Sequence, residues 1–231
     1  NILTIGCDIE SSKRSVSIAE KYEQIFAGVG VHPHDAKEIN TESLKILGSM
    51  LRHPKVVALG EIGLDFYRDR SPRDIQRSAF QKQIQLAKEM GKPIIIHDRD
   101  AHEEVIQILR EENSSEVGGV LHCFSGNLRM ARQCLDLGFY LSFTGTITYP
   151  KNEEIRDIIK AIPIERILVE TDCPYLSPQK FRGKRNEPAY VHEVCEGLAA
   201  VKGWSYEETA QKTTEAFFNL FQKADRALLW D

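Results

Sequence analysis

Two patterns of apolar residues alternate along the chain. Short runs rich in β-branched residues predict buried strands, and longer stretches with apolar residues every three or four positions predict amphipathic helices. Strands that alternate with helices are typical of parallel βα units and indicate the α/β class. The predicted strands cover residues 2–7, 26–31, 56–62, 93–97, 119–123, 139–144 and 167–170.

The predicted helices carry recognisable boundary signals. Residues 74–90 follow the helical period and are followed by Gly91, a typical helix stop. Two further helices are predicted over 188–202 and 205–221. The second opens on Ser205 with a glutamate three positions later, which is the spacing of a capping box.

Seven βα units in 231 residues favour a barrel over an open sheet. An open doubly wound sheet more often has five or six strands, whereas α/β barrels commonly use this length as one domain. The chain opens directly on an apolar strand without a methionine, so we expect a TIM-type (β/α)8 barrel, one domain over 1–231, whose first strand lies before Asn1. The active site of such a barrel lies at the C-terminal ends of its strands.

Composition narrows the range of functions. A formal net charge of −4 and a pI near 6.0 argue against binding nucleic acid through bulk positive charge, but they allow a local basic patch. No apolar run approaches the roughly 20 residues that a membrane-spanning helix needs. The five cysteines form no Cys-x-x-Cys pair, which indicates reduced, structural thiols. We therefore expect a cytoplasmic protein with no membrane association.

Histidines and acids gather at the predicted strand ends. The histidines are His32, His34, His97 and His122, and the acids are Glu61, Asp65, Asp98, Asp100, Glu170 and Asp172. A single strand-end histidine is more often a satisfied polar group than a ligand, so only the whole set indicates a metal site. Imidazole and carboxylate groups together suit zinc, manganese or a related divalent ion, and one carboxylate can bridge two ions.

The position of each acid or histidine relative to its strand end indicates which residues bind a metal and which do not. Asp172 is favoured as a ligand because it projects where the last strand gives way to a loop, while Glu170 is expected to hydrogen-bond a neighbouring loop. Three other histidines, His53, His102 and His192, lie in helical or connecting segments and are assigned no function.

Five ordered motifs resemble the TatD family of metal-dependent deoxyribonucleases. They are Gly-Val-His-Pro-His-Asp at 30–35, Gly-Glu-Ile-Gly-Leu-Asp at 60–65, Leu-His-Cys-Phe-Ser-Gly at 121–126, Glu-Thr-Asp-Cys-Pro-Tyr-Leu at 170–176 and Arg-Asn-Glu-Pro at 185–188. Several matching motifs are far more specific than one. The resemblance covers nearly the whole chain and implies a TIM-like barrel, one or two divalent ions (zinc, magnesium or manganese) and hydrolysis of phosphodiester bonds in DNA, as an exonuclease on single strands or ends.

The resemblance also assigns roles to individual residues. The implied metal ligands are Glu61, His97, His122 and Asp172. Glu61 would be shared between ions, Asp172 would belong to the second ion, and these two carboxylates would be the catalytic residues that orient water. His32 and His34 would face the substrate. A metal ion lowers the pKa of bound water and neutralises charge on the phosphate, which suits attack on an anionic diester.

Further residues are predicted to bind the substrate. Arg99 follows His97 by two positions, and its guanidinium suits bidentate contact with phosphate oxygens. The basic run 180–185, which ends on Arg185, follows the last strand on the side where barrels often hold a phosphate; a solvated loop is the alternative for its lysines. Tyr175 is expected to stack on or hydrogen-bond the substrate, with packing as the alternative.

Several questions stay open at this level. Many family members carry a His-x-His pair on the first strand, and this chain has none, so the number of ions is either one or two. The same ligand set is compatible with an amidohydrolase-like hydrolase of a small ester or amide. A truncated barrel that acts as a binding module is a third reading. The oligomeric state is not predicted.

Overall fold

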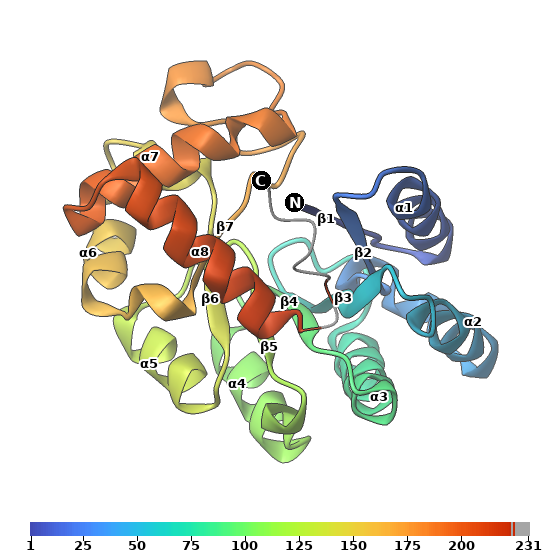
Figure 1. The fold of residues 1–231 in the computed structure, drawn as a ribbon. Helices are drawn as coiled ribbons and strands as arrows, with labels where there is room; N and C mark the ends of the chain where they lie inside the picture. The colour runs from blue at the N-terminus through green and yellow to red at the C-terminus, as the bar shows by residue number, and fades with distance from the viewer. Residues whose placement is uncertain (223, 225–231) are drawn as a thin grey trace. The chain divides into compact units, whose positions relative to one another are not determined.

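The structure is a computed structural model, and it describes residues 1–222 and 224. The chain forms two compact units, residues 1–120 with the segment that begins at Leu220, and residues 121–219. Both units are built from parallel strands that alternate with helices (Figure 1). The assignment of residues 1–231 to one domain stays a prediction.

The first unit contains four parallel strands, each paired with the next in chain order. The strands are β1 (Ile2–Ile5), β2 (Ile25–Val29), β3 (Val56–Asp65) and β4 (Ile94–Arg99). The helices are α1 (Ile9–Lys21), α2 (Thr41–Leu51), α3 (Arg73–Met90) and α4 (His102–Glu111). A short strand, β5 (Gly119–Leu121), begins at the end of this unit and finishes in the second.

The core of the first unit lies between these strands and their helices. Leu59, Ile62 and Leu64 of β3 are fully buried, as are Ile94 and Ile96 of β4. Nearly continuous apolar strands of this kind are typical of a parallel sheet that is covered by helices. Helix α1 packs against β2 and helix α3 packs against β3.

Strand β3 continues three residues past its predicted end. Residues 63–65 pair in register with residues 97–99 of β4, and these partners cannot be read from the local pattern. Gly63 has a φ of +140°, and a Cβ atom built on it would lie 2.0 Å from the carbonyl oxygen of His97. Only glycine fits this close approach. The extension places Asp65 within the strand rather than after it.

The second unit repeats the same kind of architecture. Strand β6 (Tyr140–Phe143) pairs in parallel with β7 (Ile167–Val169). Its helices are α5 (Leu128–Asp136), α6 (Glu153–Ala161), α7 (Val191–Lys202) and α8 (Tyr206–Leu220). Helix α7 begins three residues later than predicted, because residues 188–190 form a 3-10 turn.

The described residues contain all seven predicted strands, which confirms the α/β class. Two helix boundaries are also confirmed. Gly91 ends α3 in the left-handed conformation, with a φ of 57°. The hydroxyl of Ser205 accepts a hydrogen bond from the backbone N–H of Glu208 at 3.1 Å, as an N-terminal cap does.

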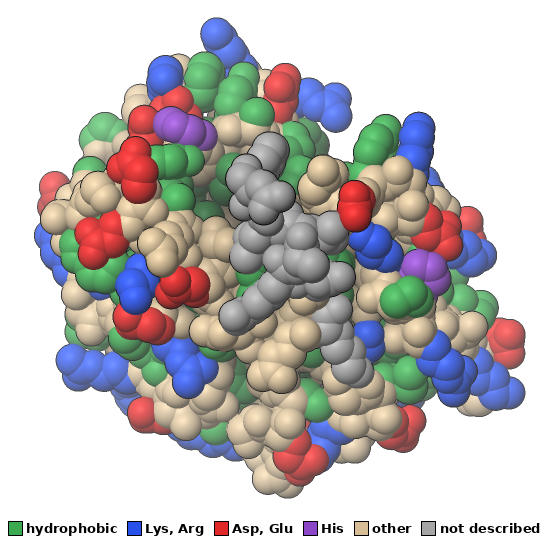
Figure 2. Space-filling view, in the orientation of Figure 1, with side chains coloured by type: hydrophobic (Ala, Val, Ile, Leu, Met, Phe, Trp, Pro, Cys, Tyr) green, Lys and Arg blue, Asp and Glu red, His purple; other side chains and the backbone are tan. Residues whose placement is uncertain are grey.

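Two features of the structure bear on the charge and hydropathy of the sequence, namely the distribution of charged side chains on the surface and the apolar character of the helices. Among the described residues on the face shown in Figure 2, acidic and basic side chains are interspersed. Within the described part of the chain, no helix combines the length and the apolar character needed to cross a membrane.

Candidate metal centre

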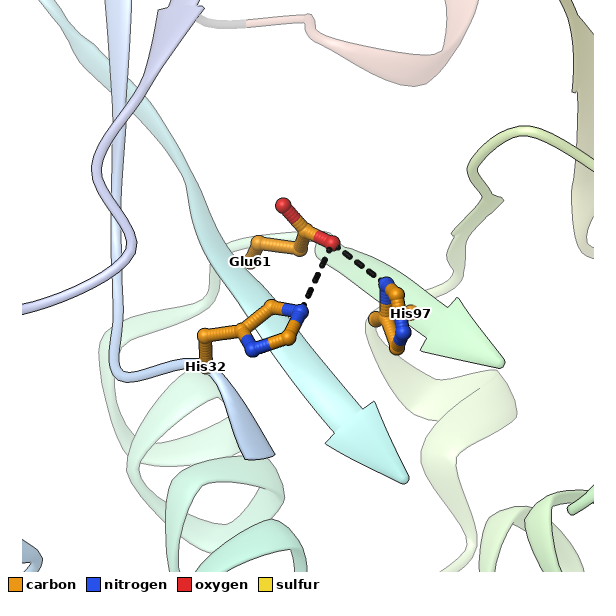
Figure 3. Close-up of side chains that lie close together, drawn as sticks. All are labelled: His32, Glu61 and His97. Carbon is orange, nitrogen blue, oxygen red and sulfur yellow. Dashed lines mark hydrogen bonds and ion pairs between the residues drawn. The ribbon is translucent and has the colours of Figure 1, made fainter. Parts of the chain in front are cut away.

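Three side chains converge near the C-terminal ends of β2, β3 and β4. His32 follows β2, Glu61 lies in β3 and His97 lies in β4 (Figure 3). Glu61 Oε1 lies 2.7 Å from His97 Nδ1 and 3.4 Å from His32 Nε2. One ligand atom from each of the three residues lies within 4.8 Å of the other two.

The residues of this cluster fit a divalent ion. The side chains of His32, Glu61 and His97 are only 10%, 14% and 16% exposed, so their donor atoms are largely removed from water. One carboxylate and two imidazoles are the donor types that zinc and related ions prefer. The cluster is therefore a candidate metal centre.

A second carboxylate, Asp65, contacts His97 of the cluster and the neighbouring His34. Its Oδ2 atom lies 2.7 Å from His34 Nε2 and 3.3 Å from His97 Nε2. Its Oδ1 atom accepts hydrogen bonds from the backbone N–H groups of Tyr67 at 3.0 Å and Arg68 at 2.7 Å.

These bonds keep Asp65 ionised. Burial opposes its charge, but the hydrogen bonds from His97, from the Arg68 backbone and from His34 outweigh burial and hold the pKa of Asp65 well below its usual range. The ionised carboxylate faces the ring nitrogen of His97 that points away from Glu61. A metal-binding histidine is usually oriented by a carboxylate in this way.

His32 is held in one tautomer. Its Nδ1 atom accepts the backbone N–H of His34 at 3.2 Å, so the neutral ring carries its proton on Nε2, the atom that faces Glu61. Burial outweighs the attraction of Glu61 and lowers the pKa of His32, which favours the neutral ring. As a ligand through Nε2, His32 would have to give up this proton; as a donor to an anionic oxygen it needs no change.

Two buried glutamines of α3 fix the strand ends that carry the cluster. The Gln83 amide accepts from Val31 N–H at 2.9 Å and donates to Val31 C=O at 3.0 Å. The Gln76 amide makes the same pair of bonds with the backbone of Asp65, at 2.8 and 3.1 Å. Both side chains are almost completely buried. Neither role can be predicted from the sequence, where the only signal is a glutamine on the apolar stripe of a predicted helix.

The second unit has its own strand-end group. Glu170 Oε2, after β7, lies 3.0 Å from Nδ1 of His122, which follows β5. Glu170 Oε1 accepts the backbone N–H of Cys123 at 2.6 Å and the hydroxyl of Ser142. Burial opposes the charge of Glu170, but His122 and these hydrogen bonds lower its pKa below the ordinary value. The expected hydrogen bond from Glu170 to a neighbouring loop is confirmed.

The remaining predicted site residues are distributed over both units. Arg99 is exposed at the end of β4 in the first unit, whereas Tyr175, which is 70% exposed, and Arg185 lie in the second. Asp172, also in the second unit, has a left-handed backbone with a φ of 52°. Lys180 pairs with Glu193 at 2.6 Å, which favours the solvated-loop alternative for this lysine.

The predicted ligand set is thus divided between the units. Glu61 and His97 belong to the first, and His122 and Asp172 belong to the second. Their joint action on one metal centre stays a prediction.

Comparison with known proteins places this site in context. A family model described as TatD related DNase matches residues 1–222. An uncharacterized metal-dependent hydrolase of Bacillus subtilis, YabD, is 47% identical over 221 residues, which are 96% of this chain and 87% of YabD. The 3'-5' ssDNA/RNA exonuclease TatD of Klebsiella pneumoniae is 38% identical over 213 residues, 90% of this chain and 80% of that protein. The crystal structure of YJJV, a TatD homolog from Escherichia coli K12, superposes with a TM-score of 0.90 at 32% identity and covers 96% of this chain and 86% of its own.

Proposed function

The chain belongs to the family of TatD-related DNases, which are metal-dependent hydrolases with an α/β barrel fold, and on this basis we propose that it cleaves phosphodiester bonds in DNA. The family and the fold class predicted from the sequence are confirmed. The observation that carries the proposal is the convergence of Glu61 and His97, with Asp65 in contact with the other ring nitrogen of His97. Exonuclease action on single strands or ends is the finer part of the proposal, and the name of the K. pneumoniae relative supports it.

We assign the binding of a divalent ion to Glu61 and His97, and we retain His122 and Asp172 as the proposed further ligands. A bound zinc, magnesium or manganese ion would lower the pKa of water and neutralise charge on the phosphate. Glu61 and Asp172 are the proposed acceptors of a hydrogen bond from the attacking water. Ionised Asp65 fixes the ring plane of His97 in this arrangement.

Several residues are positioned to hold the substrate. The protonated Nε2 of neutral His32 can donate to a phosphate oxygen without carrying a positive charge. His34 is held beside it by its bond to Asp65. Arg99 offers a guanidinium to a neighbouring phosphate, and Tyr175 and Arg185 stay as proposed contacts from the second unit. DNA as the partner and the cytoplasm as the location are parts of this proposal.

A cleavage assay on end-labelled single-stranded DNA tests the proposal. The assay is run with magnesium, manganese or zinc and with EDTA, and products that shorten stepwise from one end indicate an exonuclease. Parallel reactions with RNA, duplex DNA and a p-nitrophenyl ester measure the alternative substrates. We expect His122→Ala and Asp172→Ala to abolish cleavage, and His192→Ala, an exposed helix position, to serve as the matched control.

Two results would overturn the proposal. One is cleavage of the ester without cleavage of any oligonucleotide, which would favour the amidohydrolase-like alternative. The other is absence of bound metal in the purified protein together with no hydrolysis of any substrate, which would favour a binding module.

A further inference from the structure

The turn after β3 exposes an aromatic ring beside two arginines. Tyr67 is 58% exposed. The guanidinium of Arg99 lies 4.1 Å from the centre of the Tyr67 ring, and that of Arg68 lies 5.5 Å from it. A guanidinium at these distances from an aromatic ring forms a cation–π contact. The three residues belong to one unit and to two neighbouring strand ends.

These two arginines differ from others nearby. Arg73 pairs with Asp69 at 3.1 Å, and Arg77 pairs with Glu104. Neither Arg68 nor Arg99 forms an ion pair with any residue that the structure describes. Their guanidinium N–H groups are therefore available to an anion, although the whole chain carries a net charge of −4. Stacking on an aromatic ring leaves the donor edge of a guanidinium open for bidentate contact with a phosphate.

The turn is attached to the candidate metal centre by short contacts. His97 and Arg99 lie two positions apart on β4, so their side chains point to the same side of the strand. The backbone N–H of Phe66 donates to the Arg99 carbonyl at 2.9 Å. Asp65 joins the two features directly, because Oδ1 accepts Tyr67 N–H while Oδ2 faces His97 Nε2.

We propose that Tyr67, Arg68 and Arg99 form a nucleotide ledge that holds single-stranded nucleic acid beside the scissile phosphate. The arginines bind backbone phosphates, and the exposed part of the tyrosine ring stacks on an unpaired base. This inference deepens the proposed function and rests on it. An aromatic platform with flanking cations is the usual way to bind single strands without sequence preference, and only an unpaired base offers its face for stacking.

Binding of a fluorescein-labelled single-stranded oligonucleotide, followed by anisotropy in EDTA at several salt concentrations, tests the ledge. Tyr67→Leu is expected to weaken binding by about tenfold, because a stacked base contributes roughly that factor or more. Tyr67→Phe keeps the ring and should bind like the natural protein. Arg99→Ala should lower the slope of log K against log salt by about 0.7, the value for one phosphate contact to a single strand.

The chain offers a matched control pair in the same unit. Tyr22 is 47% exposed, and Lys21 Nζ lies 5.3 Å from its ring centre. This pair lies at the end of α1, where the chain returns to the beginning of β2, and so at the opposite ends of the strands from the metal centre. Tyr22→Leu and Lys21→Ala should leave oligonucleotide binding unchanged.

Turnover separates the ledge from the proposed function. In Tyr67→Leu, the ratio of kcat/KM for the oligonucleotide to that for bis(p-nitrophenyl) phosphate should fall by about tenfold, since the small diester cannot span both features. The ledge would be overturned if Tyr67→Leu lost the same factor in kcat/KM on both substrates. It would also be overturned if Tyr67→Leu bound the oligonucleotide with the same affinity, and had the same KM for it, as the natural protein. If the natural protein hydrolyses neither diester but the anisotropy results hold, the proposed function fails while the ledge stands.

Discussion

The polar groups at the strand ends of the two units share one feature, a hydrogen-bonded carboxylate that faces a histidine, and they differ in a second carboxylate. In each, a carboxylate accepts backbone N–H and also faces a histidine ring: Asp65 accepts two backbone N–H groups and faces His97 in the first unit, and Glu170 accepts one and faces His122 in the second. Both carboxyl groups have a lowered pKa, because these hydrogen bonds outweigh the opposing effect of burial. Each unit thus contains an anchored anion that fixes an imidazole.

The difference is Glu61. Its Oε1 atom faces two ring nitrogens, and its Oε2 atom faces the weak thiol donor of Cys7 at 3.7 Å. Glu170, in contrast, already accepts a backbone N–H and a hydroxyl. A carboxylate that is occupied by fixed donors serves as an orienting anion, whereas one that faces exchangeable ring protons can bind a cation. This difference supports the proposed role of Glu61 as a metal ligand and the proposed role of Asp65 and Glu170 as carboxylates that orient histidines.

Glu61→Gln should have the largest effect on metal binding and hydrolysis. The amide keeps the size of the side chain but removes the negative donor, so metal binding and hydrolysis should both be lost, with activity lower by about a hundredfold or more. The metal content is measured by mass spectrometry of the purified protein, and activity by the oligonucleotide assay. Glu89→Gln, at an exposed position of α3, is the matched control. Unchanged metal content in Glu61→Gln would remove this residue from the ligand set.

Glu170→Gln should have the second largest effect. If Glu170 orients His122, its neutralisation should lower activity by about ten- to a hundredfold, the range seen when an orienting carboxylate is lost. Thermal stability should also fall, because the Cys123 N–H and the Ser142 hydroxyl lose a charged acceptor. Ser142→Ala removes one of these bonds and keeps the carboxylate, so it should lower stability with a smaller loss of activity. A Glu170→Gln variant that is less stable but fully active would limit Glu170 to a structural role.

The sequence predicted the strands better than the contacts between them. Apolar runs identified all seven strands because burial on both faces leaves a local pattern. The extension of β3 to Asp65 depends on pairing with residues of β4 that lie 34 positions further along the chain, and it has no local signal. The same holds for Gln76 and Gln83, whose partners lie 11 and 52 residues away.

The candidate site shows the same limit. Motifs identified Glu61 and His97, but they assigned Asp65 no role, although it contacts His34 and His97. They also placed His32 only at the substrate, whereas the structure brings it within 3.4 Å of Glu61. Hydrogen-bond partners at strand ends are set by register and side-chain rotamers, which a pattern of residue types does not contain.

A third carboxylate–histidine pair, Asp98 and His102, is expected to affect only stability, and this is the smallest of the predicted effects. His102, the first residue of α4, lies with its Nδ1 atom 2.7 Å from Asp98 Oδ2, and the side chain is 36% exposed. The hydrogen bond to Asp98 outweighs burial and raises the pKa of His102 above its usual value. A raised pKa in the folded state means that the charged pair stabilises the protein fully below about pH 6.5, and that this contribution is lost as the pH rises through the folded-state pKa.

The melting temperature of His102→Gln should therefore fall further below that of the natural protein at pH 5.5 than at pH 8.5. The extra loss should be at most about 2 °C, since a partly exposed pair contributes little. A double-mutant cycle with Asp98→Asn isolates the pair, because the effect of His102→Gln should disappear once the partner is neutral. If the difference in melting temperature between His102→Gln and the natural protein were larger at pH 8.5 than at pH 5.5, the charged pair of His102 and Asp98 would be contradicted. Since His102 contacts none of the proposed ligands in the described structure, its removal should leave the metal content unchanged. This result would distinguish the Asp98–His102 pair, which only stabilises the protein, from the pairs Asp65–His97 and Glu170–His122, which are proposed to orient a metal-binding histidine.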